Sequence, residues 1–128
     1  MVNSNKAIQA NENSEDLQDF IIDCITDIKG KNIVLLDLRA LNDATLDYFI
    51  ICEGESTTQV KGIASNIDRR MKEERKLYSG HIEGLDHAKW ICMDYFDIAV
   101  HIFHPETRKF YELEQLWSDA VRIDIDNT

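Results

Sequence analysis

The sequence has little proline and glycine, no paired cysteines and no long apolar run. One proline and five glycines among 128 residues argue against a long flexible linker. Cys24, Cys52 and Cys92 are odd in number, lack CxxC spacing and lie in apolar runs, so we expect reduced core thiols. No apolar run reaches the roughly 18 residues that a membrane-spanning helix needs. The Asn-rich first thirteen residues contain no signal-peptide pattern, and elimination leaves the cytoplasm.

Basic residues are also scarce. The chain has 14 Lys and Arg against 24 Asp and Glu, which gives a net charge of −10. Because phosphate backbones favour Lys and Arg, this balance argues against nucleic-acid binding and favours a basic protein as partner. Acidity that serves only solubility is the alternative. The basic run between Arg69 and Lys76 is interpreted as the cationic end of a helix rather than an RNA-binding patch.

Apolar spacing predicts helices alternating with strands. Ser14 is a candidate N-cap for a helix whose apolar stripe runs from Leu17 to Ile28. Ser56 is the candidate cap of a second helix, with Gln59 completing a capping box. Strands are expected over residues 32–38, 46–52, 77–83, 89–94 and 97–104, and a last short helix over residues 113–120.

These elements predict a single mixed α/β domain, with a sheet of about five strands and helices packed against it. We expect the domain to cover residues 14–121. The polar residues 1–13 are expected to be a disordered leader, and residues 122–128 are interpreted as a tail.

The sequence offers residues for three kinds of chemical site. His101 and His104 lie three apart on a predicted strand, so they face opposite sides and do not converge on a metal ion. Buried cysteines have a raised pKa and make poor nucleophiles. The turn of Gly54, Glu55 and Ser56 precedes a helix and could cradle a phosphate, although Glu55 opposes an anion. We predict no catalytic residue, metal or cofactor, and keep a nucleotide-binding enzyme that uses this turn as the alternative.

Large side chains gather on the two strands that meet near residue 95. Two aromatic residues in a row at a tight turn are unusual unless they are packed or bound, and interfaces favour Trp, Tyr and Met. Neighbouring carboxylates suit a basic partner. A core strand with a covered hairpin is an equally open interpretation. The candidate partner-binding residues are Trp90, Met93, Asp94, Tyr95, Phe96 and Asp97.

Several stretches resemble motifs of one protein family, in the same order. DYFIICEGES at residues 47–56 resembles D-Y-F-[VI]-I-[CA]-x-G-x-S, and WICMDYFDIAVHIF at residues 90–103 resembles W-[IV]-x-x-D-[YF]-G-D-[VI]-V-V-H-[VI]-F. An E-G pair precedes the tryptophan, and residues 108–117 resemble R-x-[FLY]-Y-x-L-E-x-L-W. The chain thus resembles the ribosomal silencing factors, or Iojap family, from about Leu17 to Ala120. Phe96 replaces the usual Gly, so the turn adopts a positive φ less easily, and Ala99 replaces a β-branched residue.

The resemblance implies a fold similar to that of nucleotidyltransferases without their active site. It also implies a non-enzyme that binds a ribosomal protein on the joining face of the large subunit and blocks association with the small subunit. Translation would be repressed in this way under nutrient limitation. Family members are often homodimers when free. The resemblance places the docking surface on the strand pair around residue 95, with Trp90 and Tyr95 as the expected main anchors.

Overall fold

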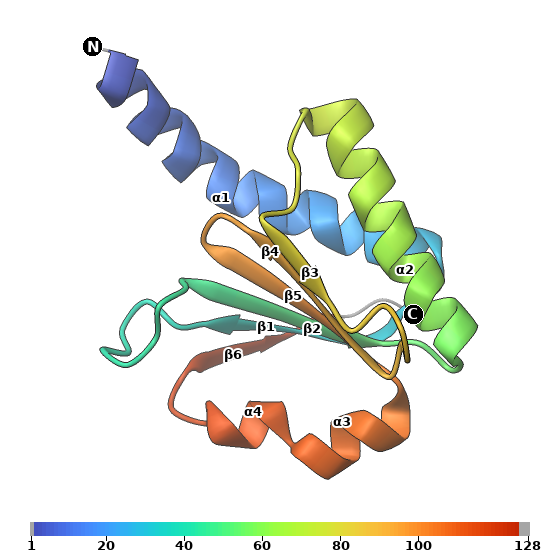
Figure 1. Cartoon of the computed structure of the whole chain (residues 1–128). Coiled ribbons are helices and arrows are strands. Elements are labelled where there is room, and N and C mark those ends of the chain that lie inside the picture. Colours follow the sequence, from blue (N-terminus) through green and yellow to red (C-terminus); the bar gives the residue numbers. More distant parts are fainter. Residues whose placement is uncertain (1, 126–128) are drawn as a thin grey trace.

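A six-stranded mixed sheet forms the centre of the molecule, with helices on both faces (Figure 1). The computed structural model describes the backbone of residues 2–125 and the side chains of residues 15–125. Helices α1 and α2 cover one face of the sheet, and α3 and α4 cover the other. The elements are α1 (Val2–Asp27), β1 (Lys31–Asp37), β2 (Tyr48–Glu53), α2 (Thr57–Arg70), the π-helix η1 (Met71–Arg75), β3 (His81–Glu83), β4 (Trp90–Tyr95), β5 (Ile98–Phe103), α3 (Pro105–Tyr111), α4 (Leu113–Leu116) and β6 (Val121–Asp124).

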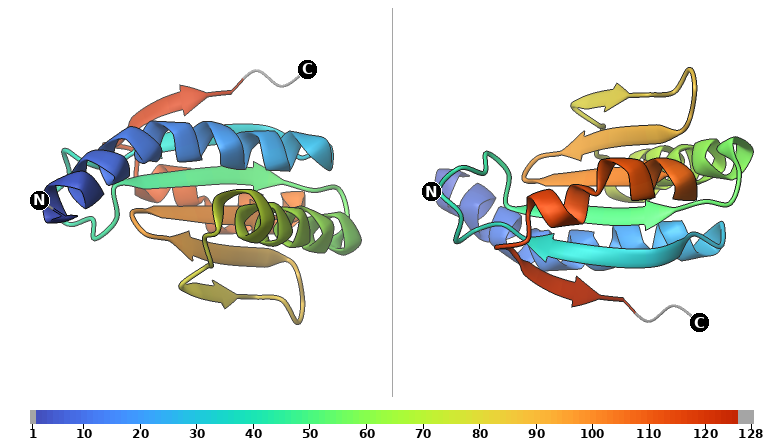
Figure 2. Two further views of the ribbon diagram at one scale, coloured as in Figure 1. Left: turned by 90° about the horizontal axis from the view of Figure 1, so that it is seen from above. Right: turned by 90° about the horizontal axis from the view of Figure 1, so that it is seen from below.

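The strands lie in the order β3-β4-β5-β2-β1-β6. Only β2 and β5 run parallel, with Ile50 opposite Val100, and the other neighbours are antiparallel. Strands β3 and β6 therefore form opposite edges of the sheet (Figure 2). The prediction of a single mixed α/β domain is confirmed, with six strands where about five were expected.

The additional strand comes from residues interpreted as part of a tail. In β6, Val121 and Ile123 alternate with Arg122 and Asp124, and the strand pairs with β1 so that Ile123 lies opposite Leu35. Alternation over so short a segment was a weak signal, and pairing with β1 decides its conformation. Residues 126–128 of the expected tail lie outside the described residues.

Helix α1 begins earlier than the sequence predicted. Its backbone runs from Val2 to Asp27 without a break at Ser14, so Ser14 is not an N-cap and residues 2–13 are helical rather than a disordered leader. Once a helix has a stable nucleus, each added residue gains a hydrogen bond, which allows the packed half to extend into a polar segment. Met1 lies outside the described residues. The domain boundaries expected at residues 14 and 121 stay a prediction.

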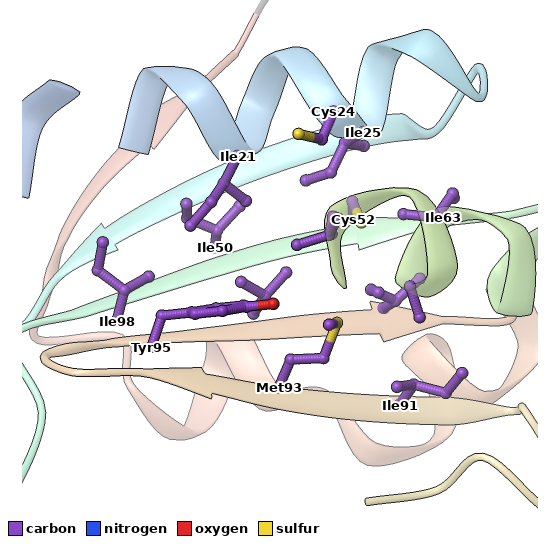
Figure 3. Close-up of a cluster of buried hydrophobic side chains, with 14 of the residues drawn as sticks. Ile21, Cys24, Ile25, Ile50, Cys52, Ile63, Ile91, Met93, Tyr95 and Ile98 are labelled. Carbon is purple, nitrogen blue, oxygen red and sulfur yellow. The ribbon is translucent and has the colours of Figure 1, made fainter. Parts of the chain in front are cut away.

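The larger core lies between the sheet and helices α1 and α2. In Figure 3, Ile21 and Cys24 of α1 and Ile63 of α2 project toward Ile50 of β2 and Met93 of β4. These five side chains are completely buried. Each aliphatic side chain buried in this way contributes about 1.5–3 kcal/mol through removal of apolar surface from water. Cys24 and Cys52 are free cysteines within this core, as predicted, whereas Cys92, which was also expected in the core, is only half-buried.

A smaller core lies on the opposite face, beneath α3 and α4. It joins Leu36, Ile51 and Phe103 of the sheet to Leu113 of α4. Helix α3 was not predicted, because Pro105 was interpreted only as the end of a strand. Proline is favoured in the first turn of a helix, and the Nδ1 of His104 accepts the N–H of Glu106 as the N-cap.

The basic run between Arg69 and Lys76 is occupied by contacts within the chain. Arg70 lies 2.7 Å from Asp27 and 2.8 Å from Glu74, and Arg75 pairs with Asp16 of α1. Arg69 pairs with Glu73, and Lys72 pairs with Asp68, each four residues apart along the helix. These contacts join α1 to α2 and agree with the interpretation of the run as a helix end. No helix in the described part of the chain is long and apolar enough to cross a membrane.

Candidate docking surface

The alternation of β4 divides the predicted partner-binding residues between the two faces of the sheet. Met93 and Tyr95 point into the core beneath α1 and α2 (Figure 3) and have exposed fractions of 0% and 1%. Trp90 and Asp94 lie on the other face and are half-buried. The expected surface position of Met93 and Tyr95 is therefore corrected, because successive residues of a strand point to opposite sides.

Trp90 is held between the sheet and helix α3. Its ring stacks on Phe103 of β5 with centroids 4.8 Å apart, and the ring of Tyr111 in α3 is tilted against it with centroids 5.0 Å apart. Its indole Nε1–H donates a hydrogen bond of 3.1 Å to the Nδ1 of His101. Gly84 (φ 90°) passes so close to the Trp90 carbonyl that any Cβ there would collide with it. These contacts fix Trp90 in one orientation.

His101 supports Trp90 only in its neutral form. The side chain is buried, and burial lowers the pKa of His101 from its ordinary value of 6.5 to about 4. Because Nδ1 accepts the Trp90 hydrogen bond, the neutral ring carries its proton on Nε2, which has no hydrogen-bond partner among the described residues. Protonation of Nδ1 would remove the acceptor. The rings of Phe49 and His101 meet edge to face with centroids 4.6 Å apart, which keeps the site apolar.

Helix α3 adds two aromatic residues that the sequence analysis did not select. Phe110 and Tyr111 have exposed fractions of 78% and 55%, and their rings meet edge to face at 5.0 Å. Together with Trp90 they form what we call the aromatic surface. The available signal was the Phe-Tyr pair in a short segment after a proline, but without the helix its direction could not be predicted.

The turn between β4 and β5 carries the remaining candidates. Phe96 is 74% exposed and adopts a positive φ of 57°, the conformation for which the related motif uses Gly. An exposed aromatic residue in this conformation costs about 1–2 kcal/mol in backbone strain. Asp97 holds the turn through its carbonyl, which accepts the N–H groups of Asp47 and Tyr48 at 3.0 Å. Along β4 this turn lies about 17 Å from Trp90, so the candidates form two groups.

The turn of Gly54, Glu55 and Ser56 is filled by its own hydrogen bonds. The Ser56 hydroxyl accepts the Gln59 N–H at 3.1 Å, as the capping box predicted, and the Gln59 side chain accepts the Glu55 N–H at 2.6 Å. A Cβ on Gly54 would lie 3.0 Å from the Val60 nitrogen. Glu55 lies 3.5 Å from Lys31, so its carboxylate offsets a positive charge that would otherwise attract a phosphate. This geometry does not favour a nucleotide at the turn.

The surroundings of His101, His104 and Cys92 favour structural positions over metal binding or nucleophilic catalysis. His101 is buried in β5, whereas His104 caps α3, so the pair does not share a face. Burial, together with the nearby Asp94 carboxylate, raises the pKa of the Cys92 thiol to about 12. A thiol of this kind is protonated at neutral pH and is a poor nucleophile.

The fold and the site define a small mixed α/β domain with a rigid, partly exposed aromatic surface, an arrangement typical of protein-binding modules. The family model described as "Ribosomal silencing factor during starvation" matches residues 11–128. The chain belongs to this family of ribosomal silencing factors.

Individual relatives agree with this assignment. The ribosomal silencing factor RsfS of Bacillus subtilis is 38% identical over 100 residues, which cover 78% of this chain and 83% of that protein. A crystal structure of a Chromobacterium violaceum protein has a TM-score of 0.76 at 31% identity and covers 81% of this chain and 85% of that one. The mouse mitochondrial assembly of ribosomal large subunit protein 1 is 35% identical over 74 residues, which cover 56% of this chain and 32% of that longer protein.

Proposed function

We propose that this chain binds a ribosomal protein on the joining face of the large ribosomal subunit and thereby blocks association with the small subunit. Translation is then repressed under nutrient limitation, in the cytoplasm. Family membership supports the ribosomal role, and the name of the mouse relative supports the large subunit. The mechanism is steric and requires no catalytic residue, because a bound domain occupies volume that the small subunit needs.

The observation that carries the docking proposal is the immobilisation of Trp90 by ring contacts with Phe103 and Tyr111 and by its hydrogen bond to His101. A side chain that is already fixed loses little conformational entropy on binding, so its buried area contributes more fully to affinity. Phe110 and Tyr111 extend the apolar area into solvent. Phe96 with Asp94 and Asp97 forms a second point of contact at the other end of β4, where the carboxylates would meet basic groups.

The net charge of −10 should affect the rate of association more than the stability of the final complex. An acidic protein approaching a basic one is accelerated by the long-range field, and added salt screens this field. We therefore expect the association rate to fall with ionic strength more than the dissociation rate rises.

Sedimentation with purified subunits tests the proposal. The chain should pellet with isolated large subunits and not with isolated small subunits, and it should leave the large subunit when salt is raised. Equal pelleting with both subunits, or with neither, would contradict the proposal. Sedimentation of the free chain tests the further expectation, taken from the family, that it forms a homodimer when unbound.

A further inference from the structure

Strand β6 is an open edge of the sheet with an apolar side. It pairs with β1 on one side and is the last strand of the sheet on the other. Val121 and Ile123 have exposed fractions of 60% and 46%. Ile123 lines a groove on the α1 side of the sheet, and Val121, two residues away along the strand, points to the same side. An edge strand with exposed apolar side chains is a template for pairing with another extended chain.

The outward backbone groups of β6 can be assigned from the ladder. The Ile125 N–H donates to the Ile33 carbonyl at 2.9 Å, which makes this pair a hydrogen-bonded one. Bonded and non-bonded pairs alternate along an antiparallel ladder, so Ile123 and Val121 also bond inward to β1. The N–H and C=O groups of Arg122 and Asp124 therefore point away from the sheet, toward an incoming strand.

A groove lies beside this edge, between β6 and helix α1. It has a volume of about 610 Å³, and its apolar floor includes Ile22, Leu35, Ile123 and Ile125. Figure 2 shows β6 beyond α1, at the edge of the sheet, when the molecule is seen from above. An added strand could place apolar side chains over Val121 and Ile123 on this side.

The rim of the groove is acidic. Among the residues whose side chains are described, Glu15 and Asp19 of α1, together with Asp37 and Asp47, line it with a single arginine, Arg39. Arg39 is held by Asp37 at 2.7 Å, and Glu15 and Asp19 form no salt bridge with the residues whose side chains are described. A segment with Lys or Arg would be attracted to this rim, and an acidic segment would be repelled.

We propose that β6 and the groove beside α1 bind an extended basic segment of a partner protein, which adds a seventh strand at the β6 edge. The main-chain groups of Arg122 and Asp124 supply the pairing, Val121 and Ile123 supply apolar contact, and Glu15 and Asp19 select for positive charge. This surface is separate from the aromatic surface, because Trp90 lies in β4, near the opposite edge and on the other face of the sheet.

A labelled ten-residue peptide with Thr at every even position and with Val and Lys alternating at the odd positions presents both Val and Lys to the groove side, and is the direct probe when tested by fluorescence anisotropy against the full chain. The same peptide with Glu in place of Lys is its control. We expect saturable binding of the Lys peptide that weakens with salt, and at least roughly tenfold weaker binding of the Glu peptide, which corresponds to one lost charge-assisted contact. Equal binding of both peptides, or binding of neither, would overturn the proposal.

Arg122→Pro removes one outward N–H but no hydrogen bond to β1, whereas Arg122→Ala removes the same side chain and keeps the N–H. The proline variant should bind the Lys peptide roughly tenfold more weakly than the alanine variant, while the two unfold at similar temperatures. Similar affinities of the two folded variants would show that β6 pairing is not used.

A second variant does not depend on how well the strand tolerates proline. Glu15→Lys with Asp19→Lys reverses the exposed rim of α1, so it should weaken the Lys peptide and strengthen the Glu peptide. Unchanged preference in this variant would overturn the charge argument. Self-association of the chain without peptide, abolished by Arg122→Pro, would instead assign the edge to a second copy and overturn the proposed partner. A Trp90 variant should leave peptide binding unchanged, so the two proposals can fail independently.

Discussion

Truncation of Tyr95 tests whether this residue belongs to the core or to the docking surface. Tyr95 was expected to be an anchor, but its exposed fraction is 1% and its ring lies among Met93, Ile98 and the helices above them. Tyr95→Ala therefore leaves a large cavity, and comparable aromatic truncations cost about 3–5 kcal/mol in free energy of unfolding. For a domain of this size, the midpoint of thermal unfolding should fall by on the order of 10–20 °C.

Tyr95→Phe is the matched control. The Tyr95 hydroxyl is buried and has no hydrogen-bond partner among the described residues, so its removal should leave the unfolding free energy unchanged or raise it by up to about 1 kcal/mol. Urea unfolding followed by circular dichroism measures both variants, and binding to large subunits is compared below the unfolding transition. If Tyr95→Ala unfolds like the parent chain but no longer binds, Tyr95 is a docking residue and the core assignment is wrong.

Three further substitutions test residues that stabilise the fold or shape the docking surface. The pKa of His101 is about 4 in the folded chain and 6.5 in the unfolded chain. The stability that depends on a neutral His101 is therefore complete above about pH 6.5 and is lost as the pH falls toward 4. This amounts to about 3 kcal/mol, and His101→Phe should remove that part of the pH dependence in urea titrations at several pH values. Arg108 bonds the carboxylates of Glu53 at 3.0 Å and Glu114 at 2.7 Å, so Arg108→Ala should lower the unfolding free energy by about 3–5 kcal/mol; a loss below about 1 kcal/mol would show that these pairs contribute little. Phe96→Gly relieves a positive φ without uncovering core, so calorimetry should find stability within about 1 kcal/mol while ribosome binding weakens; unaltered binding would remove Phe96 from the docking surface.

Most of the fold follows from local patterns in the sequence. Apolar stripes predicted α2 and the second half of α1, and continuous apolar runs predicted β1 and β2, because each of these segments buries a contiguous set of side chains. Helix α3 and strand β6 were missed because their signals are short. The sequence alone does not show whether Pro105 ends a strand or starts a helix. In the structure, the cap formed by His104 shows that Pro105 starts a helix.

The candidate site was only partly predictable. The sequence identified β4 as an aromatic strand, but not which of its side chains faces solvent, since this depends on which face α1 and α2 cover. The contact of Trp90 with Tyr111 joins residues 21 positions apart through a helix that was not predicted. The hydrogen bond from Trp90 to His101 depends on the β4–β5 register, which places His101 opposite Cys92, and no local pattern encodes it.

The most direct test of the central claim is the fraction of joined ribosomes after mixing purified subunits with an excess of this chain, measured by light scattering or gradient sedimentation. The parent chain should lower the joined fraction. The double variant Phe110→Ser with Tyr111→Ser should fold normally and bind roughly thirtyfold more weakly, so it should no longer do so. Tyr78→Ser, which alters an aromatic residue that is 67% exposed elsewhere on the surface, should act like the parent. A joined fraction that the parent chain leaves unchanged, or that the double variant lowers equally well, would contradict the account.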